Sequence, residues 1–157
     1  MILKGIIESD TVNYRKISMV LEFPKCTFKC DKECGKQICQ NSELASTPDI
    51  EIDNDVIIQM YINNPLTEAI VMQGLEPFDS LGEIIEFIKK FREVSNDDIV
   101  IYTGYTEEEV YPYLDFFKRF HNIIVKFGRF IPNDIPRYDV FLGVELASSN
   151  QYAKRIS

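Results

Sequence analysis

The chain has 157 residues, of which 45% are hydrophobic and 27% charged, and its formal net charge is −8 at pH 7. This length fits one domain over residues 1–157 with a sizeable core, and the acidic balance argues against a nucleic-acid partner, because phosphate binding needs a basic face. No apolar stretch approaches the ~20 residues that span a bilayer and the first residues lack a signal-peptide pattern, so we expect a cytoplasmic protein without a membrane partner.

The first predicted element is a strand at Ile17–Phe23, an apolar run that leads directly towards the first cysteine. Residues 54–63 predict a helix, because their apolar side chains recur on one helical face. A short apolar strand follows at Thr67–Met72. Ser80 and Glu83 then form a predicted capping box, which opens an amphipathic helix.

The same order repeats in the second half of the chain. Ile99–Tyr102 predicts a buried strand, and Thr106 with Glu109 predicts a second capping box that opens a helix ending near Phe120. Ile123–Phe127 predicts the next strand. Strands that alternate with helices in this way favour a parallel sheet with right-handed crossovers.

Four loops directly follow predicted strands, and each carries a cysteine or a glycine. They are the cysteine segment, Gly74–Pro77, Thr103–Tyr105 and Gly128–Arg129. In a parallel sheet or partial barrel, such loops all emerge at the carboxyl-terminal side, where active sites of these folds are built. We therefore expect one site formed by all four loops.

All four cysteines of the chain lie between positions 26 and 39, namely Cys26, Cys30, Cys34 and Cys39. In a reducing compartment they are not expected to form disulfides. Three thiolates suffice to hold a 4Fe–4S cluster with one iron left open, whereas all four could instead hold a structural zinc. With His121 as the single histidine, zinc sites that need two histidines are excluded.

Five short motifs follow one another along the chain. They are C-x3-C at 26–30 with Cys39-Gln40-Asn41, G-L-E-P at 74–77, Y-T-G-Y-T at 102–106, G-R-F-I at 128–131 and S-S-N-Q at 148–151. Together they resemble the radical S-adenosylmethionine (SAM) superfamily, and more narrowly the activating protein of anaerobic ribonucleoside-triphosphate reductase. The resemblance implies an α/β fold, a partial (incomplete) TIM-type βα barrel with a mostly parallel sheet.

The chain departs from that family at several positions. Eight residues separate Cys30 from Cys39 where the family has two. Asn13–Lys16 stands where a glycine-rich stretch is usual, Leu75 replaces a glycine, and Phe127 replaces an aspartate. The chain therefore looks like a divergent branch of the family.

The resemblance implies that Cys26, Cys30 and Cys39 hold the cluster, because Cys39 has the family's context for the third ligand. Cys34 is the alternative third ligand, since it gives a spacing closer to the usual one.

The resemblance also implies a set of cofactor-binding residues. These are Gly74, Glu76, Thr103, Gly104, Ser149 and Asn150. The first two are expected at the methionine end of SAM, the next two near the cofactor, and the last two at its ribose or adenine end. The alternative for each group is an ordinary turn beside a helix or strand.

The implied activity is reductive cleavage of SAM to a 5′-deoxyadenosyl radical, which generates a glycyl radical on anaerobic ribonucleotide reductase. Reduced flavodoxin or ferredoxin is the implied electron donor. Two alternatives stay open: a radical SAM enzyme with another substrate, and a non-catalytic protein that binds zinc or a cluster for interaction with a partner.

Overall fold

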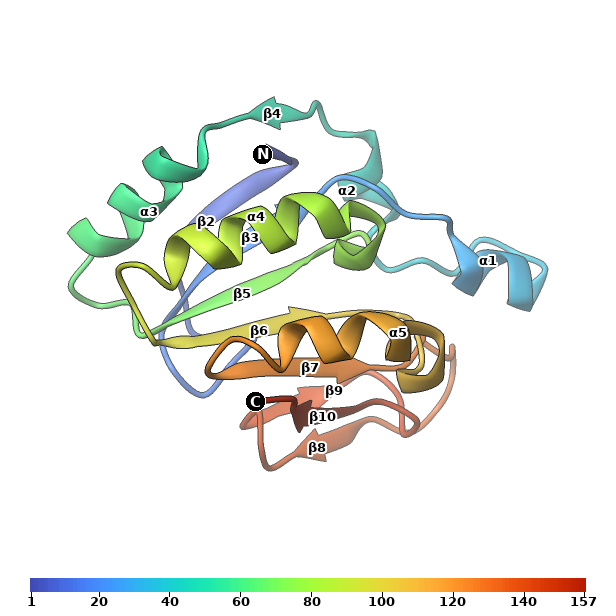
Figure 1. Cartoon of the computed structure of the whole chain (residues 1–157). Coiled ribbons are helices and arrows are strands. Elements are labelled where there is room, and N and C mark those ends of the chain that lie inside the picture. Colours follow the sequence, from blue (N-terminus) through green and yellow to red (C-terminus); the bar gives the residue numbers. More distant parts are fainter.

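The computed structural model of the protein describes all residues 1–157, and its centre is a six-stranded mixed sheet (Figure 1). The strands are β2 (Gly5–Asp10), β3 (Ser18–Phe23), β5 (Ala69–Gly74), β6 (Asp98–Tyr102), β7 (Ile123–Phe127) and β10 (Tyr152–Arg155). Their order in the sheet is β10-β7-β6-β5-β3-β2. The four middle strands are parallel, and β10 and β2 pair with them antiparallel at the two edges.

The pairing of the parallel strands places β-branched residues side by side in one row across the sheet. Val20 pairs with Val71, Val71 with Val100, and Val100 with Ile124. All four are buried, as expected for parallel strands that are covered on both faces. The four strands predicted from the sequence are therefore confirmed. The sheet is open, and its classification as an incomplete barrel stays a prediction.

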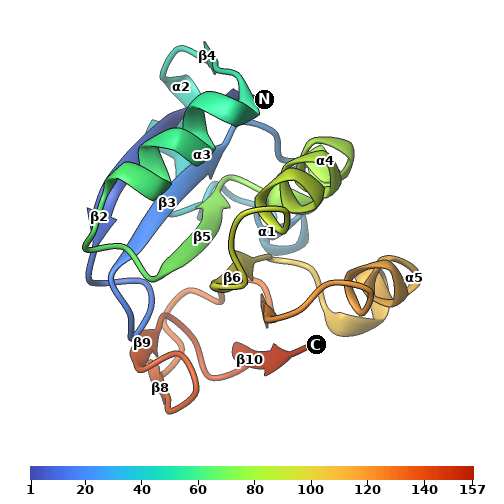
Figure 2. The same cartoon turned by 60° about the vertical axis from the view of Figure 1, so that its left-hand side comes forward.

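Three helices cover one face of the sheet, as Figure 2 shows. They are α3 (Asn54–Asn63), α4 (Leu81–Phe91) and α5 (Glu107–Phe117). Their apolar sides pack with the sheet into a core of 22 buried residues. None of the helices is both long and apolar enough to cross a membrane.

The opposite face is covered by an antiparallel hairpin of β8 (Arg137–Asp139) and β9 (Val144–Leu146). Leu142 and Leu146 of this hairpin join Tyr14 and the β-branched row in a second core. This second core fills the space between the hairpin and the sheet.

The smaller elements lie around this frame. They are β1 (Ile2–Leu3), which pairs with β4 (Ile50–Glu51), the short helices α1 (Lys29–Cys34) and α2 (Ser42–Ser46), and the 3-10 turn η1 (Pro77–Ser80).

The predicted capping box at Thr106 and Glu109 is confirmed. The Thr106 side chain accepts from the Glu109 backbone N–H, and the Glu109 carboxylate accepts from the Thr106 backbone N–H. The helix that it opens ends at Phe117, three residues before the predicted end at Phe120.

The predicted capping box at Ser80 and Glu83 is wrong. The Ser80 side chain is buried and makes no hydrogen bond, and the Glu83 carboxylate lies near the backbone N–H of Ile2. The reason is that η1 runs directly into α4, so Ser80 does not have the extended backbone that a side-chain cap needs. Glu76 takes this role one turn earlier and accepts from the backbone N–H of Phe78.

Gly74 ends β5 with a backbone φ of +97°, where residues with a Cβ are strained. An added Cβ would lie 2.7 Å from the backbone nitrogen of Phe23. We expect Gly74→Ala to lower the free energy of unfolding by about 2 kcal/mol or more, because the backbone strain alone costs ~1–2 kcal/mol. Urea denaturation would measure this loss.

The matched control is Gly82→Ala in α4, where an added Cβ meets no atom within 4 Å. This substitution should be neutral or stabilising by up to about 1 kcal/mol. Equal unfolding curves for the two variants would contradict the explanation.

Candidate functional site

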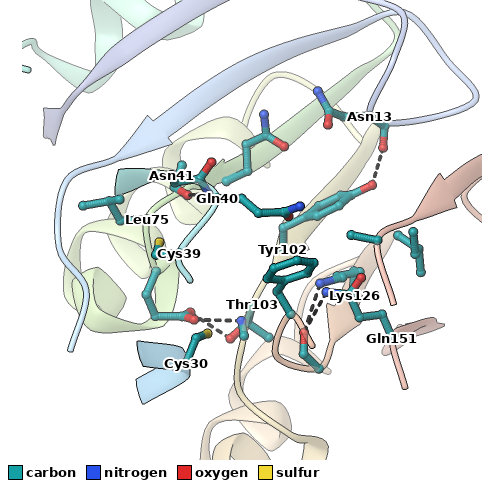
Figure 3. Close-up of a pocket in the computed structure, with 18 of the residues that line it drawn as sticks. Asn13, Cys30, Cys39, Gln40, Asn41, Leu75, Tyr102, Thr103, Lys126 and Gln151 are labelled. Carbon is teal, nitrogen blue, oxygen red and sulfur yellow. Dashed lines mark hydrogen bonds between the residues drawn. The ribbon is translucent and has the colours of Figure 1, made fainter. Parts of the chain in front are cut away.

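A cavity of about 380 Å³ lies at the carboxyl ends of the parallel strands (Figure 3). This volume is within the usual range of small-molecule sites. Its wall combines the cysteine segment with the ends of β3, β5, β6 and β7 and with β9. The loops that the sequence analysis assigned to one edge therefore do meet at one cavity.

Cys26, Cys30 and Cys39 line this cavity, whereas Cys34 does not and is exposed. Cys34 is the last residue of α1, and Gly35 follows it with a left-handed φ of 65° that reverses the chain. The structure thus places Cys39, and not Cys34, in the same wall as the first two cysteines.

Hydrogen bonds to Asp31 hold Cys39 at the cavity, at the end of the long segment that separates it from Cys30. The Oδ1 atom of Asp31 accepts hydrogen bonds from the backbone N–H groups of Ile38 and Cys39, each at 2.8 Å. Asn41 then donates through Nδ2 to the carbonyl of Gly74 at the end of β5. These bonds close the extra residues into a loop outside the cavity.

Zinc and a 4Fe–4S cluster make different demands on the positions of their thiolate ligands. A single zinc holds each thiolate at ~2.3 Å, so its sulfur ligands must lie within about 4 Å of one another. No three His, Cys, Asp or Glu side chains are arranged to hold one metal ion. Ligands of a 4Fe–4S cluster bind separate irons, and three thiols that line one cavity are compatible with such a cluster.

Burial raises the pKa of two of these thiols, those of Cys26 and Cys30. It raises the pKa of Cys26 to about 11, and the carboxylates of Glu76 and Asp79 add to this effect. The pKa of Cys30 is also raised by burial, and the nearby Arg129 opposes the shift. Cys26 is therefore protonated at neutral pH, and its binding to a cluster must release that proton.

Arg129, to which the sequence analysis assigned no role, links the cysteine helix α1 to α5. Its side chain is 12% exposed, and its Nε lies 3.1 Å from the Glu33 carboxylate, although not aligned for a hydrogen bond. Its Nη2 donates to Glu109 at 2.5 Å, and Lys29 of α1 reaches the same carboxylate at 3.1 Å. In the sequence, the motif G-R-F-I was the feature that could have drawn attention to Arg129.

Glu76 joins the loops that follow β5 and β6. Its side chain accepts from the hydroxyl of Thr103 at 2.7 Å, from the backbone N–H of Gly104 at 2.8 Å and from that of Phe78 at 3.1 Å. The residue is only 4% exposed, and burial raises its pKa to about 7 although these bonds oppose the shift. Since both carboxylate oxygens are used internally, Glu76 positions the loops.

Gly104 lies directly beside a cysteine. A Cβ added there would be 3.9 Å from the sulfur of Cys30 and 3.5 Å from the Glu76 carboxylate. Four of the predicted cofactor residues, Gly74, Glu76, Thr103 and Gly104, thus meet in the cavity wall.

Ser149 and Asn150 do not line the cavity. Ser149 donates to Asp134 through its backbone N–H and its hydroxyl, at 2.8 and 2.7 Å. Asn150 donates to the carbonyl of Arg129 at 2.9 Å. Both side chains hold the segment that follows β7, while the next residue, Gln151, lines the cavity. Their contact with a cofactor stays a prediction.

Sequence reasoning missed Lys126, which lies on β7 and lines the cavity. It is the one charged residue in the buried strand Ile-Ile-Val-Lys-Phe. A lysine inside such an apolar run was the signal that could have identified it, because lysines are almost never fully buried without a partner.

A cavity lined by three cysteines at the carboxyl edge of a largely parallel sheet is the arrangement expected of an α/β iron–sulfur protein. Residues 15–144 match the model of the family described as 4Fe-4S single cluster domain. This match covers most of the chain, including all four cysteines and the loops after β5, β6 and β7, and the chain belongs to that family. Comparisons with curated proteins and with solved structures returned no match.

Proposed function

We propose that this protein is a radical SAM enzyme. The observation that carries the proposal is that three thiols, and no fourth, share a cavity with the Gly74 and Gly104 loops. Three protein thiolates leave one iron of a 4Fe–4S cluster free to bind a small molecule. The family supports the cluster, and the motifs support SAM as the molecule that it binds.

Each part of the wall has a separate task in this proposal. Cys26, Cys30 and Cys39 would hold the cluster, and Gly74 and Gly104 would let the bound molecule approach the backbone closely. Together, cluster and SAM supply one-electron cleavage of a sulfonium C–S bond, which yields methionine and a 5′-deoxyadenosyl radical. The protein contributes by orienting the reactants and excluding water.

The proposed substrate is a glycine of anaerobic ribonucleoside-triphosphate reductase, from which a hydrogen atom would be removed to leave a glycyl radical. The motif series supports this choice, with reduced flavodoxin or ferredoxin as the proposed electron donor. The fold proposed for this activity is an open, incomplete barrel. The observed sheet is open, which is compatible with such a barrel.

Anaerobic reconstitution with iron and sulfide, followed by reduction with SAM present, tests the proposal. We expect about four irons per chain and formation of 5′-deoxyadenosine that depends on the reductant. A cluster that never cleaves SAM would instead support a non-catalytic cluster-binding protein. Adding the reductase should produce a glycyl-radical signal in electron paramagnetic resonance; cleavage without this signal would indicate another substrate.

A further inference from the structure

Lys126 is a buried cation that has no anionic partner in the protein. Its residue exposure is 7%, and its ammonium makes one hydrogen bond, to the carbonyl of Gly128 at 3.1 Å. None of the salt bridges of the protein includes it. An ammonium has three donors, so two of them are free.

Such an arrangement is costly, since a buried charge is destabilising unless it is paired. Burial lowers the pKa of Lys126 to about 8, with Glu76 and Cys30 opposing the shift, so the side chain is still mostly protonated at neutral pH.

The residues around Lys126 do not supply the missing anion. Gln151 donates to the same Gly128 carbonyl at 3.2 Å, and the face of the Tyr102 ring lies 5.7 Å away. Glu22, Glu76 and Glu145 also line the cavity, but none of them forms an ion pair with Lys126. The Gly128 carbonyl is thus shared by two donors, and Lys126 keeps two donors free.

Lys126 lines the same cavity as the three cysteines, so its free donors lie at the candidate site. Figure 3 shows Lys126 on the opposite side of Thr103 from Cys39. Its neighbour Phe127 does not line the cavity and packs into the helix-side core. The end of β7 therefore presents an ammonium to the cavity.

We propose that Lys126 forms an anion-binding subsite, which takes a carboxylate or phosphate group of the small molecule bound in the cavity. An ammonium with free donors recognises the charged oxygens that both groups share. The inference rests on the proposed function for one point only, namely that the cavity binds a small molecule. The subsite itself follows from the burial and hydrogen bonding of Lys126.

The test measures equilibrium binding to the anaerobic, cluster-loaded protein by calorimetry, with three probes: SAM, its carboxyl methyl ester and inorganic phosphate. Lys126→Gln removes the charge and Lys126→Arg keeps it. Lys154→Gln, at an exposed lysine paired with Glu107, is the control. Removing a buried unpaired charge should leave the fold intact, which thermal unfolding would check.

For a carboxylate, we expect Lys126→Gln to weaken SAM binding at least tenfold and to leave binding of the ester unchanged, with Lys126→Arg between the two. For a phosphate, wild type should bind inorganic phosphate and Lys126→Gln should not. If the substitution weakens SAM and the ester equally, or if no probe distinguishes it from wild type, the subsite is refuted. A protein that binds phosphate through Lys126 but never SAM would refute the proposed function and keep the subsite.

Discussion

Serine in place of Cys26, Cys30 or Cys39 is expected to abolish assembly of the 4Fe–4S cluster, while Cys34→Ser should assemble it as wild type does. The first three cysteines share the cavity wall, and Cys34 lies outside it on an exposed helix end. Each ligand holds a separate iron, so a missing thiolate leaves an iron without protein support. Iron and sulfide content after anaerobic reconstitution would measure the effect.

Cys34→Ser is the matched control, because it makes the same chemical change within the same segment. A variant of Cys39 that keeps a full cluster while the Cys34 variant loses it would show that the loop rearranges on cluster binding. In that case the hydrogen bonds from Ile38 and Cys39 to Asp31 would have to break. Asp31→Ala should then improve assembly, whereas the present structure predicts that it impairs assembly.

Glu76→Gln is expected to remove a stability change that wild type shows between about pH 5 and pH 8. Burial raises the pKa of Glu76 to about 7 in the folded protein, against 4.5 for the ordinary group. The folded state therefore holds this proton more tightly than the unfolded state does. Its contribution to stability is complete below pH 4.5 and is lost as the pH rises through 7, by an amount on the order of 3 kcal/mol.

The substitution also has a constant cost. The amide nitrogen of glutamine cannot accept the hydrogen bond that the Glu76 carboxylate accepts from Gly104. A buried donor without a partner costs about 1–3 kcal/mol, so the variant should be clearly less stable than wild type at pH 5 and should approach it at pH 8.

Urea denaturation of both proteins at several pH values would check this expectation. Glu108→Gln, on the exposed side of α5, is the control and should follow the wild-type profile. Parallel profiles for wild type and Glu76→Gln would mean that another group carries the pH dependence.

Much of the fold could be predicted from local patterns. The apolar runs at Ile99–Tyr102 and Ile123–Phe127 became buried parallel strands, because a continuous apolar run is stable only where both faces of the strand are covered. The helix at residues 54–63 and the capping box at Thr106 likewise depend on neighbours within a few positions. The convergence of four loops at one edge then follows from the parallel order of the strands.

Local patterns failed where distant contacts compete. Ser80 has the sequence of a helix cap, but the turn set by Glu76 buries its hydroxyl. Ser149 and Asn150 belong to a motif associated with cofactor binding; their side chains donate to Asp134 and to the carbonyl of Arg129, and their contact with a cofactor stays a prediction. In each case a hydrogen-bond partner or packing contact outside the motif determined where the side chain lies.

The sequence by itself determined that three or four thiols sit in a loop after a strand, beside glycine loops of the same sheet edge. Only the tertiary structure decided that Cys39 rather than Cys34 enters the cavity, through bonds to Asp31 and Gly74. Only the structure showed that Lys126 is buried there without an anion. Spacing constrains which residues can meet, but burial and hydrogen bonding between distant segments select among the arrangements that spacing allows.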